Sequence, residues 1–232
     1  MHSGRAEEVQ PPADDWLVWQ LADSAFPIGS FAHSSGLEAA WQHNRVPDGA
    51  ALAAFMRTSI SQAAYAWLPV VLAAHREPEN WNRWDQLCSA MLTNHVGNRA
   101  SRAQGLSLLS AAERIFGGPR LSALRADIRA GRASGHLAAV FGIVSNVMGF
   151  TVAQTARLFM FCHLRGLISS AVRLGIVGPL EGQTIQAGLS SHAEKLTRIG
   201  LQIPVAQATQ TAPILELIGA THDRLYSRLF QS

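Results

Sequence analysis

The chain has 232 residues, of which 48% are hydrophobic and only 15% are charged, and its formal net charge is +3. Because an average soluble protein carries about 25% charged residues, we expect part of this surface to be buried against a partner. All cations except Lys195 are arginines scattered without interleaved aromatics, a pattern that argues against nucleic-acid binding and suits pairing at protein interfaces.

The hydrophobic pattern separates a tail from a domain. Residues 1–15 are polar and lack the apolar run of a signal peptide, so they predict a disordered N-terminal tail. Residues 16–232 predict one helical domain, because apolar residues recur at helical spacing and alternating strand-type runs are almost absent.

The domain is expected to begin with a short helix, a loop and a second helix. The first helix covers residues 16–22, and the loop covers residues 23–35, which contain a proline, a glycine and several serines. We expect Ser34 or Ser35 to cap the second helix and Glu38 to complete a capping box.

A long helix follows Asp48, its expected N-cap, and Pro69 is expected to kink or break that helix. Its buried face is predicted to hold Leu52, Phe55, Met56, Ser59, Ile60 and Ala63. The remaining predicted helices cover residues 79–96, 98–116, 119–130, 136–148, 151–174, from the 175–179 turn to 199, and from Pro213 to about Phe230.

The predicted fold class is therefore all-α: a single-domain globular helical fold of about ten helices with a long central apolar helix over 151–174. Residues 133–156 carry no charged side chain and are long enough to span a bilayer. Their polar residues and the glycine at Gly149 favour a buried helix hairpin instead, so no membrane span is predicted.

Motifs that carry catalysis are absent from the sequence. The sole lysine follows no glycine-rich phosphate loop, and no GxGxxG or GxSxG pattern occurs. Cys88 and Cys162 form no CxxC pair and suit a reducing compartment, the cytoplasm. The histidines lie isolated rather than at ligand spacing, so no metal site and no cofactor of its own are predicted.

The loop of residues 23–35 is the most unusual stretch. Phe26 and Phe31 flank a Pro-x-Gly turn formed by Pro27 and Gly29. We expect Phe26 to plug a helix junction, because the neighbouring proline fixes its backbone. Phe31 lies beyond the turn and is the better candidate for an exposed contact.

The C-terminus is the second unusual stretch. Leu225, Tyr226, Leu229 and Phe230 keep near-helical spacing up to the last residues, whereas termini are normally polar and frayed. Such an apolar end either docks on its own domain or inserts into a partner, and the sequence favours neither.

Four segments of the chain resemble a known family. DSAFPIGSFAHSSGLE at residues 23–38 and HDRLYSRLFQS at 222–232 resemble the first and last signatures of the urease accessory protein UreF family. NRASRAQG at 98–105 and SSAVRLGIVGPLEGQ at 169–183 resemble internal segments of the same family.

The resemblance implies an all-helical, dimeric, non-catalytic protein. It implies binding to a UreD/UreH-type accessory protein and recruitment of the GTPase UreG for nickel insertion into urease apoprotein, with nickel handled within that complex. Phe31 and Arg228 occupy positions linked to recruiting the GTPase. The implied partner-binding residues are Phe31, His33, Ser34, Tyr226, Arg228, Leu229 and Phe230, and the structural motif comprises Asp23, Phe26, Pro27, Gly29, Gly36 and Glu38.

Two other hypotheses remain open. A small helical enzyme with a dispersed histidine and carboxylate site predicts a deep pocket in which perturbed titratable groups converge. A nickel-storing protein predicts tight stoichiometric metal binding by the isolated chain.

Overall fold

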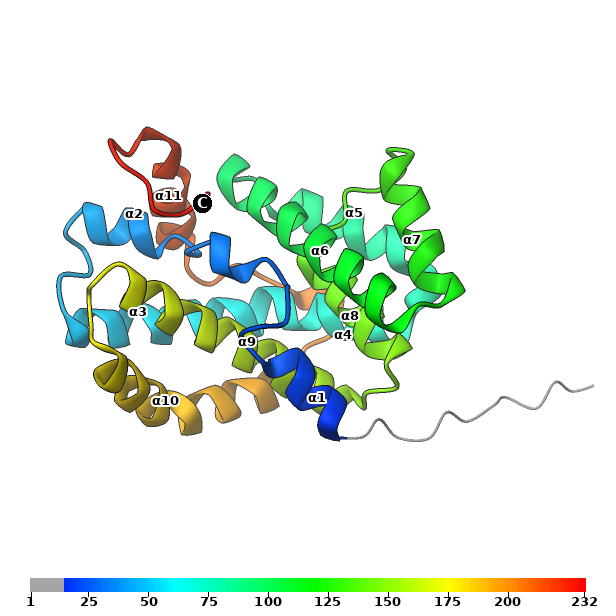
Figure 1. Ribbon diagram of the computed structural model, residues 1–232, viewed down its shortest axis with the longest axis horizontal. Helices are drawn as coiled ribbons and strands as arrows, with labels where there is room; N and C mark the ends of the chain where they lie inside the picture. Colours follow the sequence, from blue (N-terminus) through cyan, green and yellow to red (C-terminus); the bar gives the residue numbers. More distant parts are fainter. Residues whose placement is uncertain (1–14) are drawn as a thin grey trace, which may run out of the picture.

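The computed structural model describes residues 15–232, which form helices joined by turns and short loops, with no β-strand among them (Figure 1). The α-helices are α1 (Asp15–Ala22), α2 (Leu37–Gln42), α3 (Gly49–Gln62), α4 (Leu68–Arg76), α5 (Trp81–Met91), α6 (His95–Phe116), α7 (Pro119–Arg129), α8 (Leu137–Val147), α9 (Val152–Arg173), α10 (Pro179–Gly200) and α11 (Pro213–Ala220). The predicted all-α single domain is confirmed. Of the predicted N-terminal tail, only Asp15 lies within the described residues.

The centre of the core is the contact between α4 and α8. Every residue from Leu68 to His75 and from Ala138 to Ser145 is buried. Gly142 allows the two backbones to touch, since a Cβ atom at this position would lie 2.2 Å from the carbonyl oxygen of Val71. Apolar burial of this extent is the main favourable contribution to folding.

The helix after Asp48 changes its geometry before Pro69. Asp48 caps α3 as predicted, with its carboxylate accepting from the N–H of Ala51 at 2.9 Å. A π-helical turn over Ala63–Trp67 then joins α3 to α4. Proline cannot donate to the carbonyl four residues earlier, and the carbonyl of Tyr65 instead accepts from the N–H of Thr209 at 3.1 Å.

The uncharged stretch of residues 133–156 forms the predicted hairpin of α8 and α9. Gly149 makes the turn with a φ of +73°, and Thr151 and Gln154 form a capping box at the start of α9. Among the described helices, none is long and apolar enough to cross a membrane. α9 packs against α1, α4 and α10, and its role as the central helix stays a prediction.

The last predicted helix is wrong beyond Ala220. α11 ends there, a single 3-10 turn covers His222–Arg224, and residues 225–232, the C-terminal segment, continue without a helix. The near-helical spacing of apolar residues misled the prediction. The backbone N–H groups of Leu229, Phe230 and Gln231 bond to distant residues rather than to the carbonyls of a preceding helical turn.

We predict that Gly142→Ala destabilises the protein by about 3 kcal/mol, because the added methyl group forces α4 and α8 apart. Gly188→Ala is the matched control, since nothing lies within 4 Å of a Cβ atom at this α10 position. The control should stabilise the helix by about 0.5–1 kcal/mol. Urea denaturation measures both, and equal midpoints for Gly142→Ala and the wild type would contradict the assignment of this contact.

Candidate functional site

A buried carboxylate joins the start of the chain to its end. Glu38 on α2 is 1% exposed, and its oxygens accept from the N–H of Leu229 at 2.6 Å and of Phe230 at 3.1 Å. His222 lies with Nε2 2.9 Å from Glu38 Oε2, and Nε2 carries the hydrogen there because a carboxylate only accepts. The three donors satisfy a charge whose burial is otherwise costly.

The predicted capping box at α2 is therefore wrong. The hydroxyl of Ser34 does accept from the N–H of Glu38, at 3.3 Å, but the Glu38 side chain turns to the C-terminal segment instead of returning to the cap. Gly36 stands at the N-cap with a φ of +81°, a conformation that favours glycine.

The loop of residues 23–35 also pairs directly with the C-terminal segment. Gln231 donates its N–H to the carbonyl of Ala32 at 2.8 Å, and Ser34 donates its N–H to the carbonyl of Ser232 at 2.6 Å. The Ser34 hydroxyl reaches the same carbonyl at 3.1 Å, and His33 Nδ1 lies 2.5 Å from Ser232 Oγ. Of the two alternatives for the C-terminus, the structure shows docking on its own domain.

The imidazole of His33 is held neutral in this contact. Burial, followed by the nearby charges of Arg99 and His222, lowers the pKa of His33 to about 4. A charged imidazole is disfavoured there because burial removes its hydration.

Arg173, at the end of α9, connects the two segments through their aromatic rings. Its guanidinium carbon lies 3.7 Å from the ring centroid of Phe31 and 4.3 Å from that of Phe230, and Nη1 donates to the Phe31 carbonyl oxygen. Phe31 is 68% exposed, whereas Phe230 is buried. Sequence reasoning missed Arg173, because no local spacing connects it to residues more than 50 positions away.

The other residues of the Asp23–Glu38 stretch support the loop. Phe26 is buried and stacks on Phe116 with ring centroids 6.3 Å apart, while Pro27 is exposed. Asp23 accepts from the N–H of Ala25 at 2.9 Å. Gly29 has a φ of +77°, and a Cβ atom there would lie 2.9 Å from Ser107 Oγ.

The C-terminal segment also presents exposed side chains. Tyr226 is fully exposed and Leu229 is 52% exposed. Arg228 Nη1 lies 3.3 Å from Asp223 Oδ1, and the same carboxylate binds Arg99 at 2.8 Å and His95 at 3.2 Å. The hydrogen bond from Arg99, with a smaller contribution from His95, lowers the pKa of Asp223.

The segment NRASRAQG of α6 serves a structural role beside this site. Ser101 accepts from the N–H of Leu137 at 3.2 Å. A Cβ atom at Gly105 would lie 2.1 Å from the carbonyl oxygen of Gly135, so only glycine lets α6 approach the loop before α8. Arg99 reaches the C-terminal end of the chain through Asp223.

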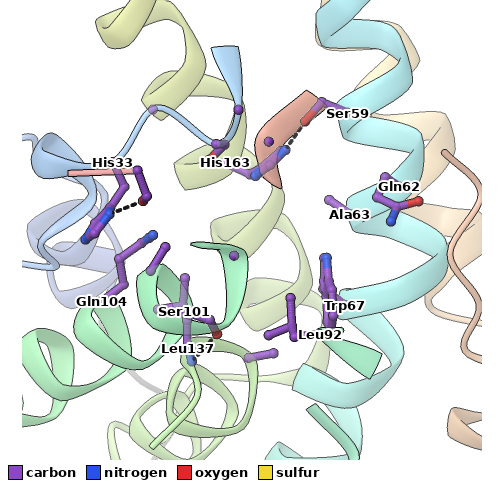
Figure 2. A pocket seen from close by; sticks show the side chains of 18 of the residues that line it. His33, Ser59, Gln62, Ala63, Trp67, Leu92, Ser101, Gln104, Leu137 and His163 are labelled. Carbon is purple, nitrogen blue, oxygen red and sulfur yellow. Dashed lines mark hydrogen bonds between the residues drawn. The ribbon is translucent and has the colours of Figure 1, made fainter. Parts of the chain in front are cut away.

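A cavity of about 220 Å³ lies beneath the paired segments (Figure 2). His33 and Gln104 lie on one side of it, and Gln62 and His163 come from α3 and α9. Nε2 of Gln62 is buried and has no hydrogen-bond partner among residues 15–232. Burial lowers the pKa of His163 to about 4, so the two histidines of the cavity are neutral at physiological pH.

Among the described residues, the cavity holds neither a serine–histidine–carboxylate triad nor a cluster of metal ligands. Ser59 Oγ lies 2.9 Å from His163 Nε2, but among residues 15–232 no carboxylate binds the imidazole of His163, as an activated serine would require. Over the same range no three histidine, cysteine or carboxylate side chains lie close enough to hold a metal ion.

The geometry defines an all-helical protein organised around a contact between its first loop and its last residues. The family model described as UreF matches residues 46–190. Urease accessory protein F of Oryza sativa subsp. indica is 37% identical over 219 residues, which cover 93% of this chain and 84% of that protein. The protein of the same name from Arabidopsis thaliana is 35% identical over 221 residues, covering 94% and 92%. The chain therefore belongs to the UreF family.

We predict that Glu38→Gln releases the C-terminal segment. The glutamine amide keeps one acceptor oxygen but places its NH2 donor against the N–H of either Leu229 or Phe230, which leaves a buried donor unpaired. Hydrogen exchange of residues 225–232 should accelerate at least ~10-fold, as measured by mass spectrometry. Glu79→Gln, at an exposed position, is the matched control, and unchanged exchange in Glu38→Gln would refute this role of the carboxylate.

We also predict that stability falls in mild acid. The unfolded chain protonates His163 near its ordinary pKa of 6.5, whereas the folded chain does so only near 4. The free energy of unfolding should therefore drop between pH 7 and pH 5, with about 2 kcal/mol from this one group. Urea denaturation at both values tests this, and His163→Gln should flatten the dependence; an unchanged slope would contradict it.

Proposed function

We propose that this chain is a non-catalytic scaffold of urease maturation that binds a UreD/UreH-type accessory protein and recruits a UreG-type GTPase for nickel insertion into urease apoprotein. One observation carries the proposal: the exposed ring of Phe31 and the exposed side chain of Arg228 lie on two segments that Glu38 and Arg173 hold together. The names of the relatives support the link to urease.

Recruitment of the GTPase is assigned to the surface that contains Phe31 and Arg228. An aromatic ring and an arginine are the residue types that contribute most to protein interfaces. The guanidinium group of Arg173 lies against one face of the Phe31 ring, which fixes the position of the ring while its other face stays exposed. A fixed contact residue loses less conformational entropy on binding than a mobile one.

Binding of the UreD/UreH-type protein is assigned to the neighbouring apolar face. Ile214 and Leu217 of α11 are 56% and 66% exposed, and Trp41 of α2 is 38% exposed. α2 and α11 pack against each other beside the C-terminal segment (Figure 1). An exposed apolar face of this kind is typical of an interaction site.

The chain is further proposed to act as a homodimer. Trp16 and Trp19 of α1 and Phe161 of α9 are exposed, and α1 packs against α9. These large apolar side chains support a second interface, separate from the C-terminal segment. Such faces are more apolar in homodimers than in transient contacts.

Nickel is assigned to the complex as its cargo, and no cofactor is assigned to this chain. Cys88 and Cys162 are free thiols, and burial raises the pKa of Cys88 to about 12 and of Cys162 to about 11. Both therefore stay protonated rather than forming the thiolates that bind metals. Free thiols also support action in the cytoplasm.

We predict that Phe31→Ala and Arg228→Ala each weaken binding of the GTPase about tenfold, which corresponds to about 1.4 kcal/mol. Arg57→Ala, an exposed α3 position, and Leu180→Ala, 86% exposed on α10, are the matched controls. Calorimetry with purified partners measures affinity, and co-expression with urease measures nickel content and activity.

The folded state of each variant is checked by circular dichroism and thermal unfolding. If both variants fold and mature urease as the wild type does, the assignment of Phe31 and Arg228 is wrong. If the wild type binds neither partner and leaves urease unmatured, the proposed function itself fails.

A further inference from the structure

An open groove runs along the outer face of α6, separate from the buried cavity. Its polar lining includes His95, Arg99 and Arg102, and no carboxylate is among the described residues that line it. Its floor is apolar, formed in part by Leu106, which is 43% exposed, and Ile128. The groove thus combines positive charge with an apolar surface.

The positive charge of this groove is only partly compensated within the chain. The carboxylate of Asp223 is shared between Arg99 and Arg228, so one negative charge faces two guanidinium groups. Within residues 15–232, Arg102 is exposed and takes part in no ion pair. The nearby carboxylate of Asp127 is already bound by Arg132 at 2.5 Å.

The dimensions of the groove fit a short peptide. Leu106 lies eleven positions after His95, which is about 16 Å along an α-helix and about five residues of extended chain. Arg99 and Arg102 lie three positions apart and therefore face the same side of α6. Guanidinium groups bind carboxylates bidentately, and Leu106, about one turn beyond Arg102, can cover an apolar side chain that follows the carboxylates.

We propose that this groove binds a short extended acidic segment of a partner protein, with carboxylates on Arg99 and Arg102 and an apolar side chain on Leu106. A protein segment fits better than a nucleic acid, because no phenylalanine, tyrosine or tryptophan is among the described residues that line the groove to stack on bases. The GTPase is the protein expected to carry the segment, since Arg228 shares Asp223 with Arg99; this assignment rests on the proposed function.

The test uses the full-length protein and Arg102→Glu, with Arg114→Glu as the matched control. Arg114 is exposed on the same helix, about 18 Å further along it. The first probe is the purified GTPase. The second is a fluorescein-labelled octapeptide in which two glutamates and a leucine occupy alternate positions with serines between them, so that an extended chain presents all three on one face. It is compared with the same peptide carrying glutamines in place of the glutamates and with a labelled single-stranded DNA octamer.

Arg102→Glu should weaken binding of the GTPase and of the acidic peptide at least tenfold, with less than twofold change for Arg114→Glu. Arg102→Lys keeps the charge but loses the bidentate fork, so its affinity should lie between those of the wild type and Arg102→Glu, and the glutamine peptide should not bind. Raising the salt concentration should weaken the wild type more than Arg102→Glu, because fewer charges pair in the variant.

The possible outcomes distinguish a failure of the groove proposal from a failure of the proposed function. If the wild type binds the GTPase but Arg102→Glu binds it and the acidic peptide equally well, the groove proposal is overturned and the scaffold function stands. If the wild type binds the peptide in an Arg102-dependent manner but not the GTPase, the groove stands and recruitment of the GTPase fails. If the DNA octamer binds more tightly than the acidic peptide and its binding depends on Arg102, the proposal that a protein segment occupies the groove is overturned.

Discussion

The buried carboxylate of Glu38 is the constraint on which the site depends. A desolvated charge is tolerated only where donors surround it, and here two of the three donors belong to the C-terminal segment. If the C-terminal segment dissociated from the domain, Glu38 would stay buried with fewer hydrogen-bond donors, or α2 would have to move. The position of α2 and the docking of the last residues are therefore coupled, although they are nearly 200 residues apart in sequence.

Two further contacts place the same segment. Arg173 stacks between the rings of Phe31 and Phe230, and Asp223 connects Arg99 on α6 with Arg228. Each contact joins one arginine of a long helix to two residues that lie outside the α-helices. The C-terminal segment is thus ordered by helices α2, α6 and α9 rather than by secondary structure of its own. The loop of residues 23–35, which contains the 3-10 turn Ser30–Ala32, is held by contacts with the same segment.

The sequence predicts the helices well where local chemistry determines them. Asp48 and the pair Thr151 and Gln154 cap helices within three residues of their own position, so the signal is readable without the fold. Glu38 shows the limit of such reading. Its spacing from Ser34 and Ser35 matches a capping box, yet the partners that decide its orientation are Leu229 and Phe230, which no local pattern identifies.

The same limit applies to the functional residues. The sequence distinguishes the buried Phe26 from the exposed Phe31. Pro27 fixes the backbone beside Phe26, and Gly29 turns the chain before Phe31. The roles of Arg173 and Asp223 cannot be predicted from the sequence, since they arise only when three segments meet in the fold. The neutral state of His33 and His163 likewise follows from burial, which the sequence around each histidine does not determine.

Docking of the C-terminal segment changes what a partner protein has to do. A disordered segment would lose conformational entropy when it binds, whereas a segment already held by Glu38 and Arg173 presents Tyr226, Arg228 and Leu229 in place. Binding to such a preorganised surface leaves more of the contact energy as affinity. A partner that required the segment to be displaced would instead have to replace the donors to Glu38. The contact at Glu38 therefore favours partners that bind over the segment rather than beneath it.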